Sequence, residues 1–431
     1  MRKAVVSASP VLWMLLVAIH VQAQDRPRTT TELVQLAIQS NRDLLATRER
    51  VAEARGLLRR AGVRPNPTVE VDYGTGRPVG SGGDQDVSFS YYQPIELGGK
   101  RGKRLTIGEG TVAAAEAELA DQTRQLIFQV KAQVADVRAA QARQAAFVEM
   151  MGTGRDSLRL TRARVEEGDA AALEGQLLGV EVARIEAQLA TSRGALMAAL
   201  LDLRRVVGFV GSEPLAVEDS PGRSAPEAVA LEALKVQALA TRPDLRAARI
   251  AEEQAAAELA LVRAEGIPDL TASVTLARET NAFEDLFATT ASGRVTPIVD
   301  RDKRVMVGLS IPLFLPGRNR GAVDAALARA TGARLHREYM EVAVPQEVEA
   351  AYARWMAANQ AVELFRSNVL EQHQQNLNVM REAYTLGHLR LIDVLNEQRR
   401  VLDTRLAYVD AETELAQAAA DLERAVGTEL P

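Results

Sequence analysis

The sequence predicts an α+β membrane protein that joins long helices to a few two-faced β-strands and is built from two copies of one plan. Three features lead to this prediction. Similar segments recur about 200 residues apart, which indicates an internal duplication. Four short stretches alternate polar and apolar residues with a period of two, and two alanine-rich stretches are long enough for helices of about 60 residues.

The N-terminus has the pattern of a secretory signal peptide. Basic residues in Met1–Lys3 precede an apolar run over 11–19, and Ala23 offers a small residue for cleavage. We therefore expect residues 1–23 to be removed. A retained anchor is the alternative, but the apolar run is shorter than the roughly 20 residues that cross a bilayer as a helix.

The composition excludes several classes of site. The 431 residues include no cysteine, which rules out disulfides, thiolate metal sites and a lipid-modified N-terminus. The net charge of −5 argues against a nucleic-acid partner, because phosphate binding favours a basic surface. No later apolar stretch is long enough for a transmembrane helix, so the mature chain is expected in the periplasm, outside the cell, or in the outer membrane as β-strands.

Matched residues define the two copies. Asp43 corresponds to Asp244, and the later pairs are Pro67 with Pro268, Pro94 with Pro312, and Gly168 with Gly387. We predict a first structural repeat over residues 24–215, a linker over 216–226 and a second repeat over 227–431. Prolines in Ser212–Pro226 support the linker.

Each repeat is expected to begin with an amphipathic helix and to end with a long helical hairpin. The first helix is predicted over 31–61 and again over 227–265, and each copy stops at a proline-containing breaker. Long helices are predicted over 101–165 and 320–384, the second with a kink at Pro345. Each would be about 100 Å long, so these helices must pack side by side as coiled coil.

Between the helices, four predicted strands have one polar and one apolar face. Their polar residues are expected to line the lumen of a membrane barrel, although a soluble sheet with one wet face would show the same alternation. These residues are Glu70, Asp72, Ser88, Ser90, Thr271, Ser273, Thr275 and Ser310. Predicted loops over 74–86 and 278–304, around Gly82 and Phe287, join the strands and are expected outside the cell.

Four strands are too few to close a barrel, for which about eight is the minimum. An open sheet edge is not tolerated in lipid, so other copies of the chain must complete the barrel. Three copies would supply twelve strands. We therefore expect a homotrimer with a twelve-strand outer-membrane β-barrel, continued by a long α-helical barrel across the periplasm.

This duplicated plan resembles the TolC family of outer-membrane efflux proteins over essentially the whole mature chain. Segment Ala383–Asn396 is similar to the motif at the family's periplasmic hairpin tip, and Gln93–Arg101 resembles the CzcC-type branch that serves heavy-metal cation exporters. The resemblance implies a passive exit channel for heavy-metal cations, without enzyme activity or cofactor. Its implied partners are a resistance-nodulation-division pump in the inner membrane and a periplasmic adaptor.

At the hairpin tip, the resemblance implies a gate. Gly387 would let the long helix turn back, since glycine adopts backbone conformations that other residues resist. Asp393 would join a carboxylate ring that constricts the entrance and attracts cations, and Asn396 stands where relatives carry a second acid. Gly168 and Glu174 are the corresponding residues of the first repeat.

Tyr384 and Arg390 are candidates to bond the neighbouring hairpin and hold the tip closed. Each tip residue also has a simpler interpretation. Tyr384 would then be ordinary packing, Arg390 a surface charge, Asp393 a solvated helix carboxylate, and Glu174 either an adaptor contact or an exposed side chain.

The remaining features give no enzymatic or metal site. His336, His373 and His388 lack the spacing and clustered carboxylates of a metal site, and no phosphate loop or nucleophile elbow occurs. The basic run Lys100–Arg104 is expected to be a solvated belt below the membrane strands. Alternative functions are a periplasmic adaptor, which would carry a single hairpin, a drug- or protein-export channel of the same family, and a structural coiled coil.

Overall fold

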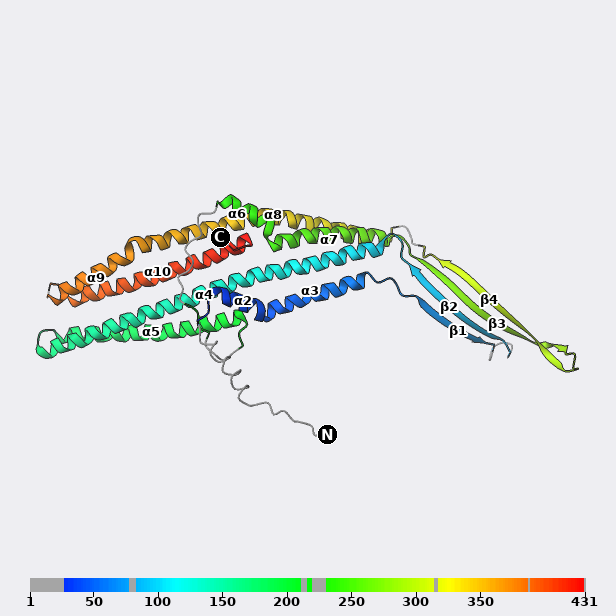
Figure 1. Ribbon diagram of the computed structural model, residues 1–431, viewed down its shortest axis with the longest axis horizontal. Helices are drawn as coiled ribbons and strands as arrows, with labels where there is room; N and C mark the ends of the chain where they lie inside the picture. The colour runs from blue at the N-terminus through cyan, green and yellow to red at the C-terminus, as the bar shows by residue number, and fades with distance from the viewer. Residues whose placement is uncertain are drawn as a thin grey trace, which may run out of the picture. The chain divides into compact units, whose positions relative to one another are not determined.

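The computed structural model describes residues 27–76, 83–210, 215–218, 230–313, 317–386 and 388–429 (Figure 1). The chain forms two compact units. The helical unit comprises Met1–Glu49, Ala117–Arg246 and Met340–Pro431, and the sheet unit comprises Arg50–Glu116 and Ala247–Tyr339. Each unit takes segments from both halves of the chain. The predicted signal peptide and most of the predicted linker lie outside the described residues.

The elements follow the same order in both halves: a pair of short helices, two strands, a long helix and a returning helix. The first half contains α2 (Thr30–Ser40), α3 (Arg42–Ala61), β1 (Thr68–Thr75), β2 (Gln85–Ile95), α4 (Lys100–Glu167) and α5 (Ala172–Val207). The second half contains α6 (Leu231–Thr241), α7 (Pro243–Glu265), β3 (Leu270–Thr289), β4 (Val295–Ser310), α8 (Arg320–Leu364), a π-helical segment (Phe365–Val369), α9 (Leu370–Thr385) and α10 (Leu391–Val426). The predicted α+β class is confirmed.

The first helix of each repeat is broken in two, where a single helix was predicted. Asn41 ends α2 in an extended conformation, and its side-chain oxygen caps α3 by accepting from the backbone N–H groups of Asp43 and Leu44, both at 3.0 Å. Its amide nitrogen donates to the carbonyl of Val206 at 2.8 Å. In the second half, Pro243 starts α7, the position that tolerates its missing N–H.

The first long helix, α4, has nearly the predicted bounds, but the irregularity of the second long helix is not at the predicted residue. Helix α8 continues through Pro345 without interruption, and the irregularity comes at the π-helical segment. There Arg366 donates to the Tyr408 hydroxyl of α10 at 3.1 Å, and the Phe365 ring meets the Tyr408 ring edge-on at 6.1 Å. The π-helical segment, whose turn is wider than that of an α-helix, therefore coincides with a side-chain contact to α10 and not with Pro345.

The core of the helical unit includes part of the predicted linker. Leu215 and Val217 are buried with Leu33, Val130 and Leu203 in one apolar cluster. Residue 217 also forms a parallel bridge with Arg28. The described residues 215–218 are therefore packed, because their apolar side chains fill a space between α2, α4 and α5.

No helix in the described ranges is both long enough and apolar enough to cross a membrane.

The sheet unit contains a four-stranded antiparallel sheet in the order β1-β2-β3-β4. Strands β3 and β4 are much longer than predicted and run through most of the expected loop 278–304. They pair from Thr271 with Ser310 out to Thr289 with Val295, with a bulge between Phe283 and Phe287. The loop prediction was wrong because this charged stretch still contains β-branched residues that favour strands.

The turn between these strands is confined to Thr290–Arg294, where the amide of Thr290 donates to the carbonyl of Arg294 at 2.9 Å. Gly293 has a φ of +76°, a conformation that suits glycine. Phe287, expected in a loop, lies in β3 opposite Pro297. Gly82, the centre of the first predicted loop, lies outside the described residues.

Candidate functional site

The first hairpin of the helical unit turns at Gly168, which follows the end of α4. Its φ of +88° is left-handed, and its amide donates to the carbonyl of Val165 at 3.2 Å. The amide of Asp169 reaches back to Arg164 at 2.8 Å. These two bonds close the helix end in the way that a glycine after the last turn allows, and α5 then begins at Ala172.

The second hairpin turns between α9 and α10. The amide of His388 donates to the carbonyl of Ala383 at 2.9 Å, and Arg390 is the extended residue before α10. Gly387, the expected turn residue, lies outside the described residues. Its role therefore stays a prediction.

A side-chain bond joins the two hairpin ends within one chain. The Tyr384 hydroxyl donates to Oε2 of Glu174 at 2.7 Å, and the Arg164 guanidinium lies 5.7 Å from the centre of the Tyr384 ring. Burial raises the pKa of Tyr384, and the Glu174 carboxylate raises it further. The phenol consequently keeps its proton and acts as the donor.

Beneath this bond, an apolar cluster fixes the same two hairpins. Leu178 of α5 packs with Leu391 and Leu395 of α10, and all three are buried. Leu158 and Tyr384 pack against them. The tyrosine therefore both packs and forms a hydrogen bond, so the two interpretations of this residue hold together.

Asp393 and Arg390 interact with each other on one helix rather than with the other hairpin. Nε of Arg390 is 3.3 Å from Oδ2 of Asp393, three residues later. Asp393 lies in the first turn of α10, where a carboxylate interacts favourably with the helix dipole. Its side chain is 31% exposed, and Asn396 is exposed one turn later. Within one chain, Arg390 does not make the expected bond to the neighbouring hairpin.

Sequence reasoning missed a buried carboxylate, Glu181, that pairs with two partly exposed arginines and joins α5 to α10. Oε1 and Oε2 of Glu181 accept from Arg184 and Arg399 respectively, each at 2.6 Å. Burial raises the pKa of Glu181, but the hydrogen bonds from the two arginines outweigh it, so the pKa is lowered. The i,i+3 spacing of Glu181 and Arg184 was the only signal in the sequence. Nearby, Nδ1 of His373 lies 3.1 Å from Glu397.

In the sheet unit, the strand register puts all predicted lumen residues on one face. Residues directly opposite each other share a face, as do residues two apart along a strand. The rows that this register defines contain Glu70 with Ser90 and Thr275, Asp72 with Ser88, and Thr271 with Ser310. Ser90 and Thr275 hydrogen-bond at 2.9 Å, and Ser88 donates to Asp72 at 2.9 Å. Ser273 lies between Thr271 and Thr275 on β3 and faces the same way.

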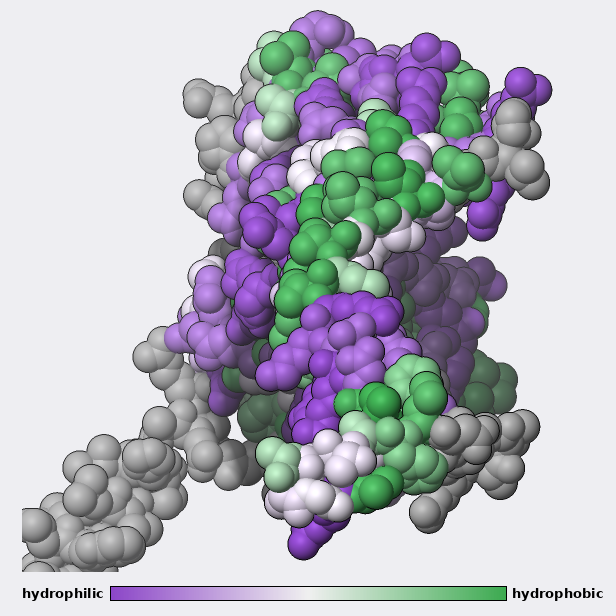
Figure 2. Space-filling model, turned by 90° about the vertical axis from the view of Figure 1, so that its right-hand side faces the viewer, coloured by the Kyte–Doolittle hydropathy of each residue, from purple (hydrophilic) through white to green (hydrophobic). Residues whose placement is uncertain are grey.

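The opposite face of the sheet is apolar and exposed. Its central rows are Val69, Tyr91, Val274 and Val307, then Val71, Phe89, Leu276 and Val305. The exposed fractions reach 68% at Val71 and 78% at Val307. Figure 2 shows a band of hydrophobic side chains between hydrophilic ones on one face of the molecule. Exposed apolar patches of this kind mark a site of contact with a membrane or with another protein.

Residues of the segment Gln93–Arg101 form hydrogen bonds that join two turns at the base of the sheet. Nζ of Lys100 donates to the Ile267 carbonyl and to Asp269, both at 2.8 Å, and the Leu97 amide also donates to Asp269, at 2.9 Å. Lys100 is buried, so the predicted solvated belt is wrong at this residue. Its neighbours contribute to the same junction, since Arg104 pairs with Glu96. The bonds fix the turn from β2 to α4 against the turn from α7 to β3.

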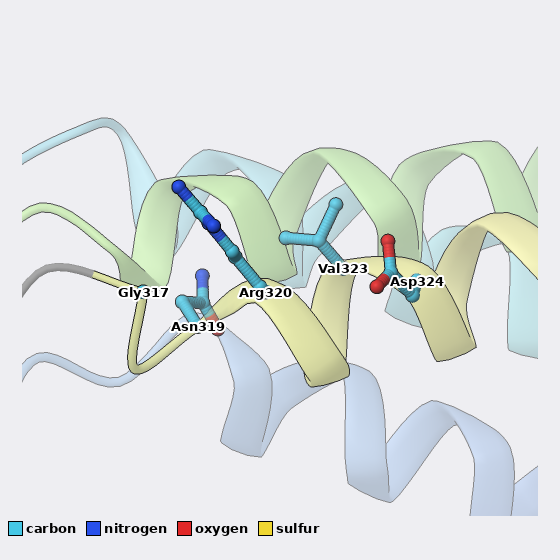
Figure 3. A pocket seen from close by; sticks show the side chains of 5 residues that line it. All are labelled: Gly317, Asn319, Arg320, Val323 and Asp324. Atoms are coloured by element: carbon cyan, nitrogen blue, oxygen red, sulfur yellow. The ribbon is translucent and has the colours of Figure 1, made fainter.

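A depression in the sheet unit lies at the start of α8 (Figure 3). It is lined by Gly317, Asn319, Arg320, Val323 and Asp324. The Asn319 amide is already used, since it donates to the Val262 carbonyl at 2.6 Å. Among the side chains that the structure describes, no group of three histidine, aspartate or glutamate residues is placed to hold a metal ion.

The comparison with known families decides between the remaining classes. Residues 33–209 and 234–428 match the family described as outer membrane efflux protein. The chain belongs to this family. It is therefore an outer-membrane transport protein that extends into the periplasm, and the adaptor alternative is not supported. The resemblance inferred from the sequence is confirmed.

The relatives and solved structures agree. The chain is 24% identical to the cobalt-zinc-cadmium resistance protein CzcC of Cupriavidus metallidurans, over 93% of this chain and 90% of CzcC. It is 28% identical to the nickel-cobalt-cadmium resistance protein NccC of Alcaligenes xylosoxydans xylosoxydans, over 75% and 69%. Its fold is similar to that of CusC, with a TM-score of 0.74 and 20% identity over 93% of this chain and 92% of that one. It is also similar to VceC of Vibrio cholerae, with a TM-score of 0.72 and 18% identity over 93% and 97%.

Proposed function

We propose that three copies of this chain form an outer-membrane channel that is a passive exit duct for heavy-metal cations. In this proposal, an inner-membrane pump of the resistance-nodulation-division type and a periplasmic adaptor deliver the cations. The channel performs no enzymatic step and uses no cofactor. The observation that carries the proposal is the sheet with one exposed apolar face and one polar face.

The open edges of this sheet support assembly. In the described part of the chain, β1 and β4 each have a strand on one side only. Lipid leaves no water to satisfy an unpaired edge, so β4 of one copy must pair with β1 of the next. Three copies close twelve strands, with the apolar face toward lipid and the polar face toward the lumen.

The substrate proposal rests on the relatives and on the charge of the polar face. CzcC and NccC are named as metal-resistance proteins. One row across the sheet contains Asp86, Glu279 and Asp302 in directly opposed positions, on the face that would line the lumen. A lumen with this charge favours cations over anions.

The gate proposal concerns the tips of the helical hairpins. Tyr384 and Glu174 would hold the two hairpins of one copy together, while Asp393 of three copies would form a carboxylate ring at the entrance. Gly168 and Gly387 would allow the turns, and Asn396 would face the ring from one turn further along α10. Arg390 would partly neutralise the ring through its pair with Asp393.

A deletion strain tests the function. Loss of the gene should lower the tolerated concentration of Co²⁺, Zn²⁺ or Cd²⁺ severalfold, and expression of the chain from a plasmid should restore it. Equal or greater sensitisation to hydrophobic antibiotics would instead favour a drug-export channel. For assembly, the purified protein should migrate as a heat-resistant trimer in detergent. A monomer with full pore activity would contradict the barrel.

A further inference from the structure

Three cations lie together on the apolar face of the sheet, beyond its central rows. Arg278 of β3 is directly opposite Lys303 of β4, and Arg301 lies two residues from Lys303 on the same face. The side chains of all three are exposed. The same row continues across β2 and β1 to Val87 and Tyr73, which belong to the apolar face.

These cations lack the carboxylate partners that arginines elsewhere in the sheet possess. Among side chains that the structure describes, none forms an ion pair with Arg278, Arg301 or Lys303. By contrast, Arg304 on the polar face is 2.8 Å from Glu279 and 3.6 Å from Asp302. Like charges in directly opposed strand positions repel each other, so an anion between Arg278 and Lys303 would relieve that repulsion.

The charges in this part of the sheet are sorted by face. Along β4, Asp300, Asp302 and Arg304 alternate with Arg301 and Lys303, so the carboxylates lie on the polar face and the unpaired cations on the apolar face. A hairpin surrounded by water has no reason to separate its charges in this way, because pairing across neighbouring strands is favourable. The separation indicates that the two faces meet different surroundings.

We propose that Arg278, Arg301 and Lys303 bind the phosphate groups of lipid headgroups in the outer leaflet of the membrane. This inference rests on the proposed function, in which the apolar face contacts lipid. The cations begin in the row next to that of Val71 and Val305, on the side away from the helices. A phosphorylated glycolipid would lay its acyl chains against these rows and its phosphates against the cations. Arginine and lysine are suited to this contact because their stems are apolar and their ends charged.

Binding of bisphosphorylated lipid A to the purified protein in uncharged detergent tests the proposal. The variant with both Arg278→Gln and Lys303→Gln should bind this lipid roughly thirtyfold more weakly, since each cation near an anionic surface contributes about 1 kcal/mol. The matched control carries Arg294→Gln and Arg304→Gln, which remove two cations from the turn and the polar face. The control should bind like the native protein. Lipid A from which both phosphates have been removed should bind native protein and double variant equally.

Three results would overturn the proposal: equal binding of lipid A by the double variant and native protein, an equal loss in the control, or displacement of lipid A by inorganic phosphate at similar concentration. The last result would indicate a site for a free anion. Conductance in planar bilayers separates this inference from the proposed function. If the native protein conducts but the double variant retains lipid A, only the lipid site is wrong. Absence of conductance from the native protein would contradict the channel itself.

Discussion

Tyr384 at the end of α9 donates a 2.7 Å hydrogen bond to Glu174 in the first turn of α5, and this bond links two hairpins that are far apart in the sequence. The contact is specific because the partly buried phenol keeps its proton and the carboxylate accepts its hydrogen bond. The two residues also lie above the leucine cluster of Leu178, Leu391 and Leu395, which excludes water from one side of the bond. A change that removes only the hydroxyl therefore separates hydrogen bonding from packing.

Tyr384→Phe should loosen the hairpin tip and increase the time that the channel spends open. A hydrogen bond to a charged group contributes about 1.5 kcal/mol, so the open-to-closed ratio should rise roughly tenfold in single-channel recordings. Tyr408→Phe is the matched control, because Tyr408 bonds Glu412 and Arg366 away from the tip. An identical rise in both variants would mean that general loosening, not the Tyr384 bond, opens the channel.

The parts of this site differ in how far the sequence predicts them. The residue types at the tip follow from a local motif, but the pairing of Tyr384 with Glu174 depends on how two distant hairpins pack. Within one chain Arg390 binds Asp393, because a partner three residues away on the same helix costs less side-chain entropy, and its bond to a neighbouring hairpin stays a prediction. The break at Asn41 also involves a distant contact that the local sequence does not show, since its amide donates to the Val206 carbonyl.

The sheet shows the opposite case, in which a local period predicts the result well. Strand alternation depends only on neighbouring residues, so all predicted lumen residues lie on one face. The alternation between faces was not recognised over residues 278–304, because there it is in the sign of the charge rather than in hydropathy. Asp302 and Lys303 are both polar, yet they lie on opposite faces.

Asp393→Asn should weaken block of the channel by a trivalent cation applied from the periplasmic side. If three Asp393 carboxylates face each other, each increases the affinity of the others for cations. Single-channel recording at increasing cation concentration measures the block. Asp410→Asn is a suitable control, because Asp410 pairs with Arg143 elsewhere on α10. Unchanged block in Asp393→Asn would remove this residue from the entrance while leaving the channel assignment intact.

Glu181→Gln should lower stability at neutral pH, and its effect should decrease in acid. The pKa of Glu181 is lowered in the folded protein, so its contribution is complete above the unfolded pKa of about 4.3 and is lost as the pH falls through the folded pKa. The expected cost at pH 7 is about 1–3 kcal/mol. Melting temperatures of both proteins between pH 7 and pH 3 measure the difference.

The control for this pair is Glu186→Gln. Glu186 lies on the same helix and binds Arg155 at 2.8 Å, but both side chains are more than half exposed. An exposed pair contributes about 0–1 kcal/mol, so this variant should melt close to the native temperature at every pH. A destabilisation by Glu181→Gln that is constant from pH 7 to pH 3 would show that the loss arises from packing rather than from charge.

An epitope tag inserted at Gly293 should be labelled on intact cells. The structure moves the insertion point here from Phe287, because Phe287 is paired within β3 whereas Gly293 occupies the turn. A tag after Gly82, in the other predicted loop, should behave in the same way. If the tag is labelled only after the outer membrane is permeabilised, the turn faces the periplasm and the predicted orientation of the sheet is wrong.

The final prediction compares two neighbouring residues of β4 that lie on opposite faces. Val307 is on the apolar face and 78% exposed, whereas Met306 is on the polar face and 52% exposed. If the apolar face contacts lipid, Val307→Arg places a charge in the hydrocarbon at a cost of about 2–4 kcal/mol near the bilayer centre. Met306→Arg places the same charge in a wet lumen, where the cost is small.

Val307→Arg should therefore reduce the amount of trimer in the outer-membrane fraction, while Met306→Arg should leave it near the native amount. The two substitutions insert the same side chain one residue apart, so strand propensity and local charge are closely matched. A water-exposed sheet would accept both variants, because Val307 is the more exposed position. Native amounts of trimer from both variants would thus indicate that water, not lipid, surrounds the sheet. An equal loss of trimer from both would mean that β4 tolerates a new charge on neither face.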